Sequence, residues 1–155
     1  MTAGATESVN LAFQAAGEGS CLVSSIEHTS VLKASGLHRK PVLVQPDHKG
    51  HISPEAIKAA LTPEVSFVSI ALANHELGYV QPIEEIARVL EVERERRRAA
   101  GEKMPLVFHT DASQVAALVD VKCKRLGVDL MTLSAAKVLR SKAGWFVMGA
   151  SRSLS

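Results

Sequence analysis

Two polar residues of this sequence stand where an apolar segment ends, and both are of types that do chemistry. Asp111 follows the segment Leu106–Thr110, and Lys137 follows the segment Val128–Ser134. A partly buried carboxylate needs a cationic partner, which either a protonated ring nitrogen of a cofactor or a helix N-terminus can supply. A desolvated lysine has a lowered pKa, so its neutral amine is available to form a Schiff base. Taken alone, Asp111 is equally suited to capping a helix, and Lys137 to reaching water from an apolar surface.

Three other groups of residues have similar positions. Residues 3–8 combine small side chains with a helix start, which suits either plain capping or the binding of an anion such as phosphate. His28 follows Cys21–Ser25, and Asn74 follows Val65–Leu72. An imidazole can lie flat on an aromatic ring and an amide can bind a phenolate oxygen, although a lone histidine is usually a satisfied surface or core residue. The coincidence of five such positions favours a binding site.

The elements that must position these residues alternate along the chain between strand-length apolar segments and segments of helical period. The predicted strands are Cys21–Ser25, Val42–Gln45, Val65–Leu72, Leu106–Thr110, Val128–Ser134 and Trp145–Met148. The predicted helices are Ser8–Ala16, Thr29–Ser35, Pro54–Leu61, Ile83–Ala100 and Ala112–Val119. This order is typical of an α/β domain with a mostly parallel sheet flanked by helices on both faces. Because ligands of such sheets bind at the carboxyl ends of the strands, we expect the polar residues to meet there.

The composition limits the class of protein. A chain of 155 residues with 46% hydrophobic residues suits one globular domain, and its net charge of +2 does not favour a nucleic-acid partner. No apolar run reaches the roughly 18 residues of a spanning helix, so no membrane partner is expected. Cys21 and Cys123 lack the spacing of a disulfide framework or a zinc site, so we expect no metal and a reducing, cytoplasmic location.

Five motifs give the sequence a resemblance to a known family. They are Gly-Ala-Thr-Glu-Ser, Glu-His-Thr-Ser, Leu-Ala-Asn-His-Glu-Leu-Gly, His-Thr-Asp-Ala-Ser-Gln and Ser-Ala-Ala-Lys, in this order between Thr2 and about Val138. In wording and order they resemble the cysteine desulfurases, of the class V aminotransferase group within fold-type I pyridoxal-phosphate enzymes. The resemblance implies that residues 1–138 are the central part of the large, cofactor-binding domain of such an enzyme.

The resemblance also implies which residues bind pyridoxal 5′-phosphate. Ala5 and Thr6 would hold the cofactor phosphate, with Ser134 joining them from the far side. His28 would stack on the pyridine ring. Asp111 would pair with the protonated ring nitrogen and so keep the ring an electron sink.

The remaining matches concern the reacting side of the ring. Asn74 and Gln114 would bind the phenolic oxygen and the substrate side of the cofactor. Lys137 would carry the cofactor as a Schiff base and then act as the general base. Lys137 and His28 are therefore the predicted catalytic residues.

The family activity implied is the conversion of L-cysteine to L-alanine, with transfer of the sulfur to an enzyme cysteine as a persulfide. The persulfide serves a sulfur-acceptor or scaffold protein in iron–sulfur cluster or thio-cofactor synthesis, and the family enzymes are homodimers. Neither Cys21 nor Cys123 matches the position of the family's catalytic cysteine, so we expect this chain itself to be impaired. The alternatives are another class V enzyme, such as an aminotransferase or a selenocysteine lyase, and a non-catalytic α/β remnant.

The sequence departs from the family pattern around the lysine. Ala136 stands where the family usually has a histidine, which removes one expected phosphate contact. Residues 138–142 read Val-Leu-Arg-Ser-Lys where the family typically has an aromatic residue followed by Gly-Pro-Lys. One cytosine inserted into codons for Val-Tyr-Gly-Pro-Lys yields Val-Leu-Arg-Ser-Lys. We therefore treat residues 139–155 as a divergent tail, with a frameshift as the hypothesis for its origin.

Overall fold

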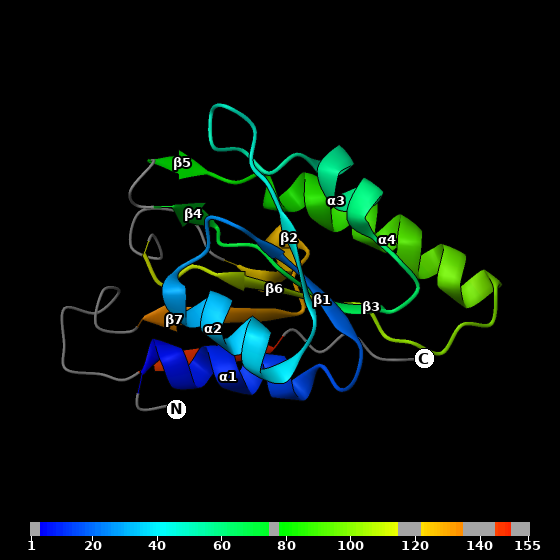
Figure 1. Cartoon of the computed structure of the whole chain (residues 1–155), viewed down its shortest axis with the longest axis horizontal. Coiled ribbons are helices and arrows are strands. Elements are labelled where there is room, and N and C mark those ends of the chain that lie inside the picture. Colours follow the sequence, from blue (N-terminus) through cyan, green and yellow to red (C-terminus); the bar gives the residue numbers. More distant parts are fainter. Residues whose placement is uncertain (1–3, 75–77, 115–121, 135–144, 150–155) are drawn as a thin grey trace.

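The centre of the fold is a six-stranded sheet, shown in Figure 1. The computed structural model describes residues 4–74, 78–114, 122–134 and 145–149. In spatial order the strands are β2 (Pro41–Val44), β1 (Ser20–Ser24), β3 (Val65–Ser69), β6 (Val107–Asp111), β7 (Leu130–Ser134) and β8 (Trp145–Gly149). The first five are parallel, and β8 is antiparallel to β7. The predicted α/β fold is confirmed.

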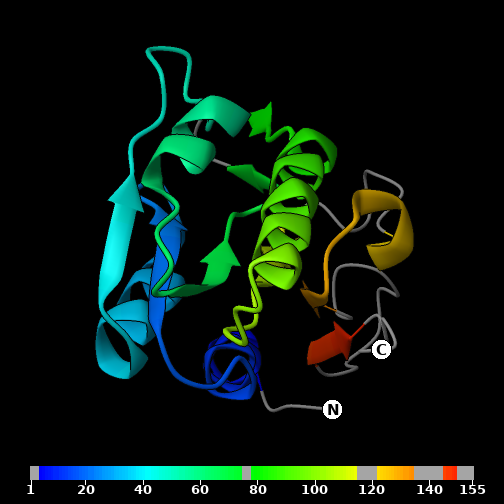
Figure 2. The same ribbon diagram turned by 90° about the vertical axis from the view of Figure 1, so that its right-hand side faces the viewer.

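Helices cover both faces of this sheet. One face carries α1 (Ala5–Ala15) and α2 (Thr29–His38), and the other carries α3 (Pro54–Ala60), α4 (Ile83–Ala99) and α5 (Cys123–Leu126). Figure 2 shows β2 at one edge of the sheet and β8 at the other. The helix start predicted at Ser53-Pro54 is confirmed, because the Ser53 side chain accepts a hydrogen bond from the Ala56 N–H at 3.0 Å.

Two separate cores hold these layers together. Beneath α1 and α2, the ring of Phe13 packs against Phe67 of β3 with 4.6 Å between centroids. On the opposite face, Ile57 of α3 and Leu90 of α4 are fully buried against Val68 of β3. Burial on both faces explains why β3 is continuously apolar or small instead of alternating with polar residues. Among the described residues, no helix has both the length and the apolar character needed to cross a membrane.

The predicted strand Val65–Leu72 is wrong over its last three residues. The parallel ladder ends at Ser69, and the chain continues into a small antiparallel hairpin of β4 (Ala73–Asn74) and β5 (Tyr79–Val80). The Ala71 N–H is bound at 2.6 Å by the side chain of Glu27 and not by a strand carbonyl.

The predicted helix Ala112–Val119 is wrong over its first three residues. Ala112 to Gln114 form a turn, in which the Ser113 N–H donates to the Asp111 carboxylate at 2.9 Å. This side-chain bond competes with the start of a helix. Residues 115–119 lie outside the described residues.

A buried histidine joins the central strands. His109 of β6 is fully buried, with Nδ1 2.9 Å from Ser69 Oγ on β3 and Nε2 2.9 Å from Thr132 Oγ1 on β7. Its ring stacks on Phe67, with the ring planes 18° apart. Burial lowers the pKa of His109 to about 4, so the imidazole is neutral at neutral pH.

We predict that His109→Phe lowers the free energy of unfolding by about 2 kcal/mol at pH 7, because it leaves two buried hydroxyls without their partner. The folded pKa lies below the 6.5 of the free side chain, so the unfolded chain binds the proton more tightly. Acid therefore destabilises the wild type by roughly 3 kcal/mol through this residue between pH 6.5 and 4. Urea unfolding at pH 7 and pH 4 should show the advantage of the wild type over His109→Phe falling by roughly 3 kcal/mol, so that it disappears or reverses in acid. A difference that does not change with pH would contradict a neutral His109.

Candidate functional site

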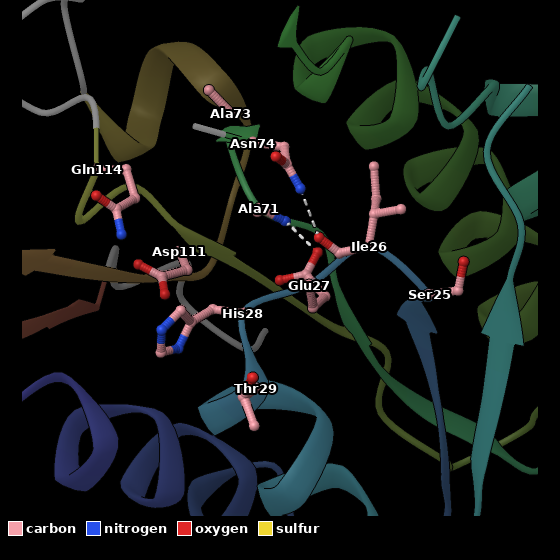
Figure 3. A pocket seen from close by; sticks show the side chains of 10 residues that line it. All are labelled: Ser25, Ile26, Glu27, His28, Thr29, Ala71, Ala73, Asn74, Asp111 and Gln114. Atoms are coloured by element: carbon pink, nitrogen blue, oxygen red, sulfur yellow. Dashed lines mark hydrogen bonds between the residues drawn. The ribbon is translucent and has the colours of Figure 1, made fainter. Parts of the chain in front are cut away.

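A cavity of about 380 Å³ opens at the carboxyl ends of β1, β3 and β6, a size within the range of small-molecule sites. Its walls are the β1–α2 loop, the segment that follows β3, and the end of β6 (Figure 3). The lining residues are Ser25, Ile26, Glu27, His28, Thr29, Ala71, Ala73, Asn74, Asp111 and Gln114. The position is the one expected for a ligand site in a parallel sheet.

Four of the predicted site residues line this one cavity. They are His28, Asn74, Asp111 and Gln114, which are separated by up to 86 residues in the sequence. The parallel pairing of β1, β3 and β6 brings them together, because the three strands end at the same edge.

Two of the other predicted residues, Ala5 and Thr6, lie within the described part of the chain and are not among the residues that line the cavity. Ala5 and Thr6 form the first turn of α1, which begins on the side of the sheet where the parallel strands end (Figure 1). Ser134 is the last residue of β7. Lys137 lies outside the described residues.

His28 both begins a helix and presents a ring to the cavity. As the N-cap of α2, its Nδ1 accepts a hydrogen bond from the Ser30 N–H at 3.2 Å and lies 2.8 Å from Ser30 Oγ. The residue is nevertheless exposed. The ring is therefore held in one orientation by the helix start while remaining accessible to a planar ligand.

The polar groups of Asp111 and Asn74 are anchored by backbone contacts. Asp111 receives the Ser113 N–H on its carboxylate, and its main-chain oxygen receives the Leu72 N–H at 2.9 Å. Asn74 donates from Nδ2 to the carbonyl of Ile26 at 2.9 Å, which ties the hairpin to the end of β1. Both side chains are thus positioned before any ligand arrives.

The sequence did not predict that Glu27 belongs to the site. Glu27 is only 7% exposed, its Oε1 accepts from Ala71, and its Oε2 has no hydrogen-bond partner among the described residues. Burial raises the pKa of Glu27 to about 8; the Ala71 N–H opposes this shift and the charge of Asp111 adds to it. The sequence feature that could have indicated Glu27 is an acidic residue directly before His28, in the loop that follows a buried strand.

The described side chains suit a planar cation better than a metal ion. Asp111 supplies an anion, His28 supplies a flat ring, and Asn74 and Gln114 supply amide groups. These are the groups that a protonated pyridine with a phenolic oxygen requires. Within residues 4–74, 78–114, 122–134 and 145–149, no three side chains gather as a metal site would require.

Neither cysteine has the environment of a reactive thiolate. Cys21 is fully buried in β1, and burial raises the pKa of its thiol to about 11. Burial also raises the pKa of Cys123. At neutral pH both therefore remain thiols, which are poor nucleophiles.

Comparison with known proteins supports the resemblance seen in the motifs. The cysteine desulfurase IscS of Anaeromyxobacter sp. (strain K) is 36% identical over 151 residues, which cover 91% of this chain and 35% of that relative. The IscS of Methanosarcina thermophila is 34% identical over 143 residues, covering 86% of this chain and 33% of the relative. The chain thus spans about a third of the length of these relatives.

Solved structures agree with the fold. SspA, whose structure is a complex with cysteine, superposes with a TM-score of 0.78 at 31% identity, over 94% of this chain and 42% of that one. A NifS-like protein at 23% identity has the same fold, with a TM-score of 0.79 over 98% of this chain and 42% of the other. The family model described as aminotransferase class-V, a family that normally uses pyridoxal phosphate, matches residues 1–145. The chain therefore belongs to the class V aminotransferase family and is related within it to the cysteine desulfurases.

Proposed function

We propose that this chain is the cofactor-binding part of a cysteine desulfurase-like protein, and that its strand-end cavity binds pyridoxal 5′-phosphate. The observation that carries the proposal is the meeting of Asp111, His28 and Asn74 around one cavity, with Gln114 beside them. A pyridoxal ring offers a partner to each kind of group: a ring N–H to the carboxylate, a flat face to the imidazole, and a phenolic oxygen to the amides.

The chain's own residues bind and orient the ring. The Asp111 carboxylate would accept the ring N–H and stabilise the protonated form of the ring, while His28 would pack flat on it. Asn74 and Gln114 hydrogen-bond the phenolic oxygen and the substrate side. When bound, the cofactor supplies an electron sink for chemistry at the substrate α-carbon.

The phosphate and the covalent link are assigned by the motifs. We assign the phosphate to Ala5 and Thr6 at the start of α1, together with Ser134 at the end of β7. We assign the covalent attachment of the cofactor to Lys137, whose amine would accept and return the substrate proton. These four assignments rest on the family resemblance.

For the whole protein we propose a sulfur-transfer reaction. L-cysteine and an enzyme thiol would give L-alanine and an enzyme persulfide, in a homodimer that passes the sulfur to an acceptor or scaffold protein for iron–sulfur cluster or thio-cofactor synthesis. A cytoplasmic location belongs to the same proposal. The complex of the related SspA with cysteine supports this choice of substrate class.

For the 155 residues themselves, we propose cofactor binding without sulfur transfer. Cys21 and Cys123 are the two cysteines of the sequence, and burial raises the pKa of both thiols. Neither can supply the thiolate that attacks a substrate sulfur.

We predict that pyridoxal phosphate added to the pure chain produces a visible absorption band, which borohydride fixes as a stable adduct. The band should disappear in Lys137→Ala and persist in Lys58→Ala, which changes an exposed lysine of α3. The readout is absorbance before and after reduction and dialysis. A band of equal intensity in Lys137→Ala would show that Lys137 does not carry the cofactor.

A pair of substitutions separates the two roles of His28. His28→Asn retains a good N-cap but removes the ring, so we expect cofactor affinity to fall about 3- to 10-fold with little change in stability. His28→Ala removes both, so it should also lower the free energy of unfolding by about 1 kcal/mol. Fluorescence titration with the cofactor and urea unfolding measure the two effects. If His28→Asn binds as tightly as the wild type, the stacking role is wrong.

A further inference from the structure

Glu27 has an unusual position for an acidic residue. It lies in the loop between β1 and α2, is more than nine-tenths buried, and turns its carboxyl into the wall of the cavity (Figure 3). One carboxyl oxygen is already engaged, since Oε1 accepts the Ala71 N–H at 2.6 Å. The other, Oε2, has no partner among the described residues.

This geometry suits a carboxylic acid better than a carboxylate. A buried carboxylate requires a cation or several donors, but Glu27 receives a single N–H and no salt bridge from the described part of the chain. Its charged neighbour is Asp111, an acid of the same sign. Two like charges at one poorly solvated site do not both ionise, so one of the two carboxyls retains a proton.

Asp111 is the more solvated of the two acids. It is only partly buried, and its carboxylate already receives the Ser113 N–H. Glu27 is the more deeply buried, so it bears the higher cost of ionisation. The proton therefore resides on Glu27.

We propose that Glu27 is a positioning residue for the cofactor. It remains a neutral acid whose Oε1 holds the Ala71 N–H and so fixes the segment that carries Asn74 in the cavity wall. Its Oε2 hydroxyl, which has no partner among the described residues, would donate to an acceptor that enters the cavity. The positioning role rests on the proposed cofactor site, whereas the neutrality of Glu27 is a property of the chain alone.

The pH dependence of stability tests the neutrality without any cofactor. The folded pKa of Glu27, about 8, lies above the ordinary 4.5, so the folded state binds the proton more tightly. The wild type must lose stability as pH rises from about 4.5 to 8, and the loss must stop above 8. Of the titratable groups around Glu27, His28 is its chain neighbour, while Asp111 and His109 lie on β6; all three are retained in a Glu27 variant.

The matched variant is Glu27→Gln, since the amide reproduces a neutral acid with one acceptor and one donor. Across this pH window, the unfolding constant of the wild type should rise relative to that of Glu27→Gln by up to tenfold per pH unit. Glu95→Gln, at an exposed position of α4, is the control that should show no such trend. A wild-type unfolding constant that stays parallel to that of Glu27→Gln from pH 4.5 to 8 would mean that Glu27 is ionised throughout this range, and would overturn the proposal.

Cofactor affinity tests the positioning role. Titration with pyridoxal phosphate at pH 7 should give Glu27→Gln an affinity within about threefold of the wild type. Glu27→Met, which has neither donor nor acceptor, should bind about 10-fold more weakly or worse. Equal affinity in Glu27→Met would overturn the positioning role alone. A wild type that binds no pyridoxal phosphate would overturn the proposed function and the positioning role together, and the pH experiment would still decide the state of Glu27.

Discussion

The side chain of His109 links β6, which carries Asp111 of the site, to both neighbouring strands of the sheet. Its two ring nitrogens bond Ser69 of β3 and Thr132 of β7, so the centre of the sheet is held by a side chain as well as by the backbone ladder. Asp111 lies two residues further along β6 and on the same face of the strand. A neutral, fully bonded imidazole beneath the cavity therefore fixes the strand end that carries the acidic group.

Two acidic residues, Glu27 and Asp111, line the cavity next to this histidine, and their environments differ. Asp111 meets an N–H donor and is partly solvated, whereas Glu27 is deeply buried with one oxygen unsatisfied. The difference allows one carboxyl to carry a charge toward a cationic ring and the other to remain neutral as its support. His28 completes the wall from the start of α2, where the same hydrogen bond that caps the helix also orients the ring.

Most of the fold could be predicted from alternating apolar and helical segments, because burial on both faces of a parallel sheet leaves a clear pattern. The strand predicted at Trp145–Met148 is confirmed as β8, although its antiparallel direction was not predicted. The end of β3 could not be predicted. Ile70 and Leu72 are almost as buried as the strand before them, and the side chain that binds the intervening Ala71 N–H is that of Glu27, 44 residues away.

Residues placed by local sequence patterns were predicted to belong to the site, whereas a residue placed by a long-range contact was missed. His28, Asn74, Asp111 and Gln114 follow predicted strands directly, so a parallel sheet places them at one edge. Glu27 was missed because its burial depends on a contact with Ala71 that no local pattern contains. The structure brings the four predicted side chains to one cavity, but their roles, like those of Ala5, Thr6, Ser134 and Lys137 and the division of the chain after residue 138, stay predictions.

The central claim is that the strand-end cavity directs pyridoxal phosphate to one lysine. The most direct measurement is mass-spectrometric peptide mapping of the chain after borohydride reduction with the cofactor. We predict that the label lies on Lys137 in the wild type and that Asp111→Ala greatly reduces it there. A label spread over exposed lysines such as Lys33, Lys58 and Lys103, and unchanged in Asp111→Ala, would contradict the claim.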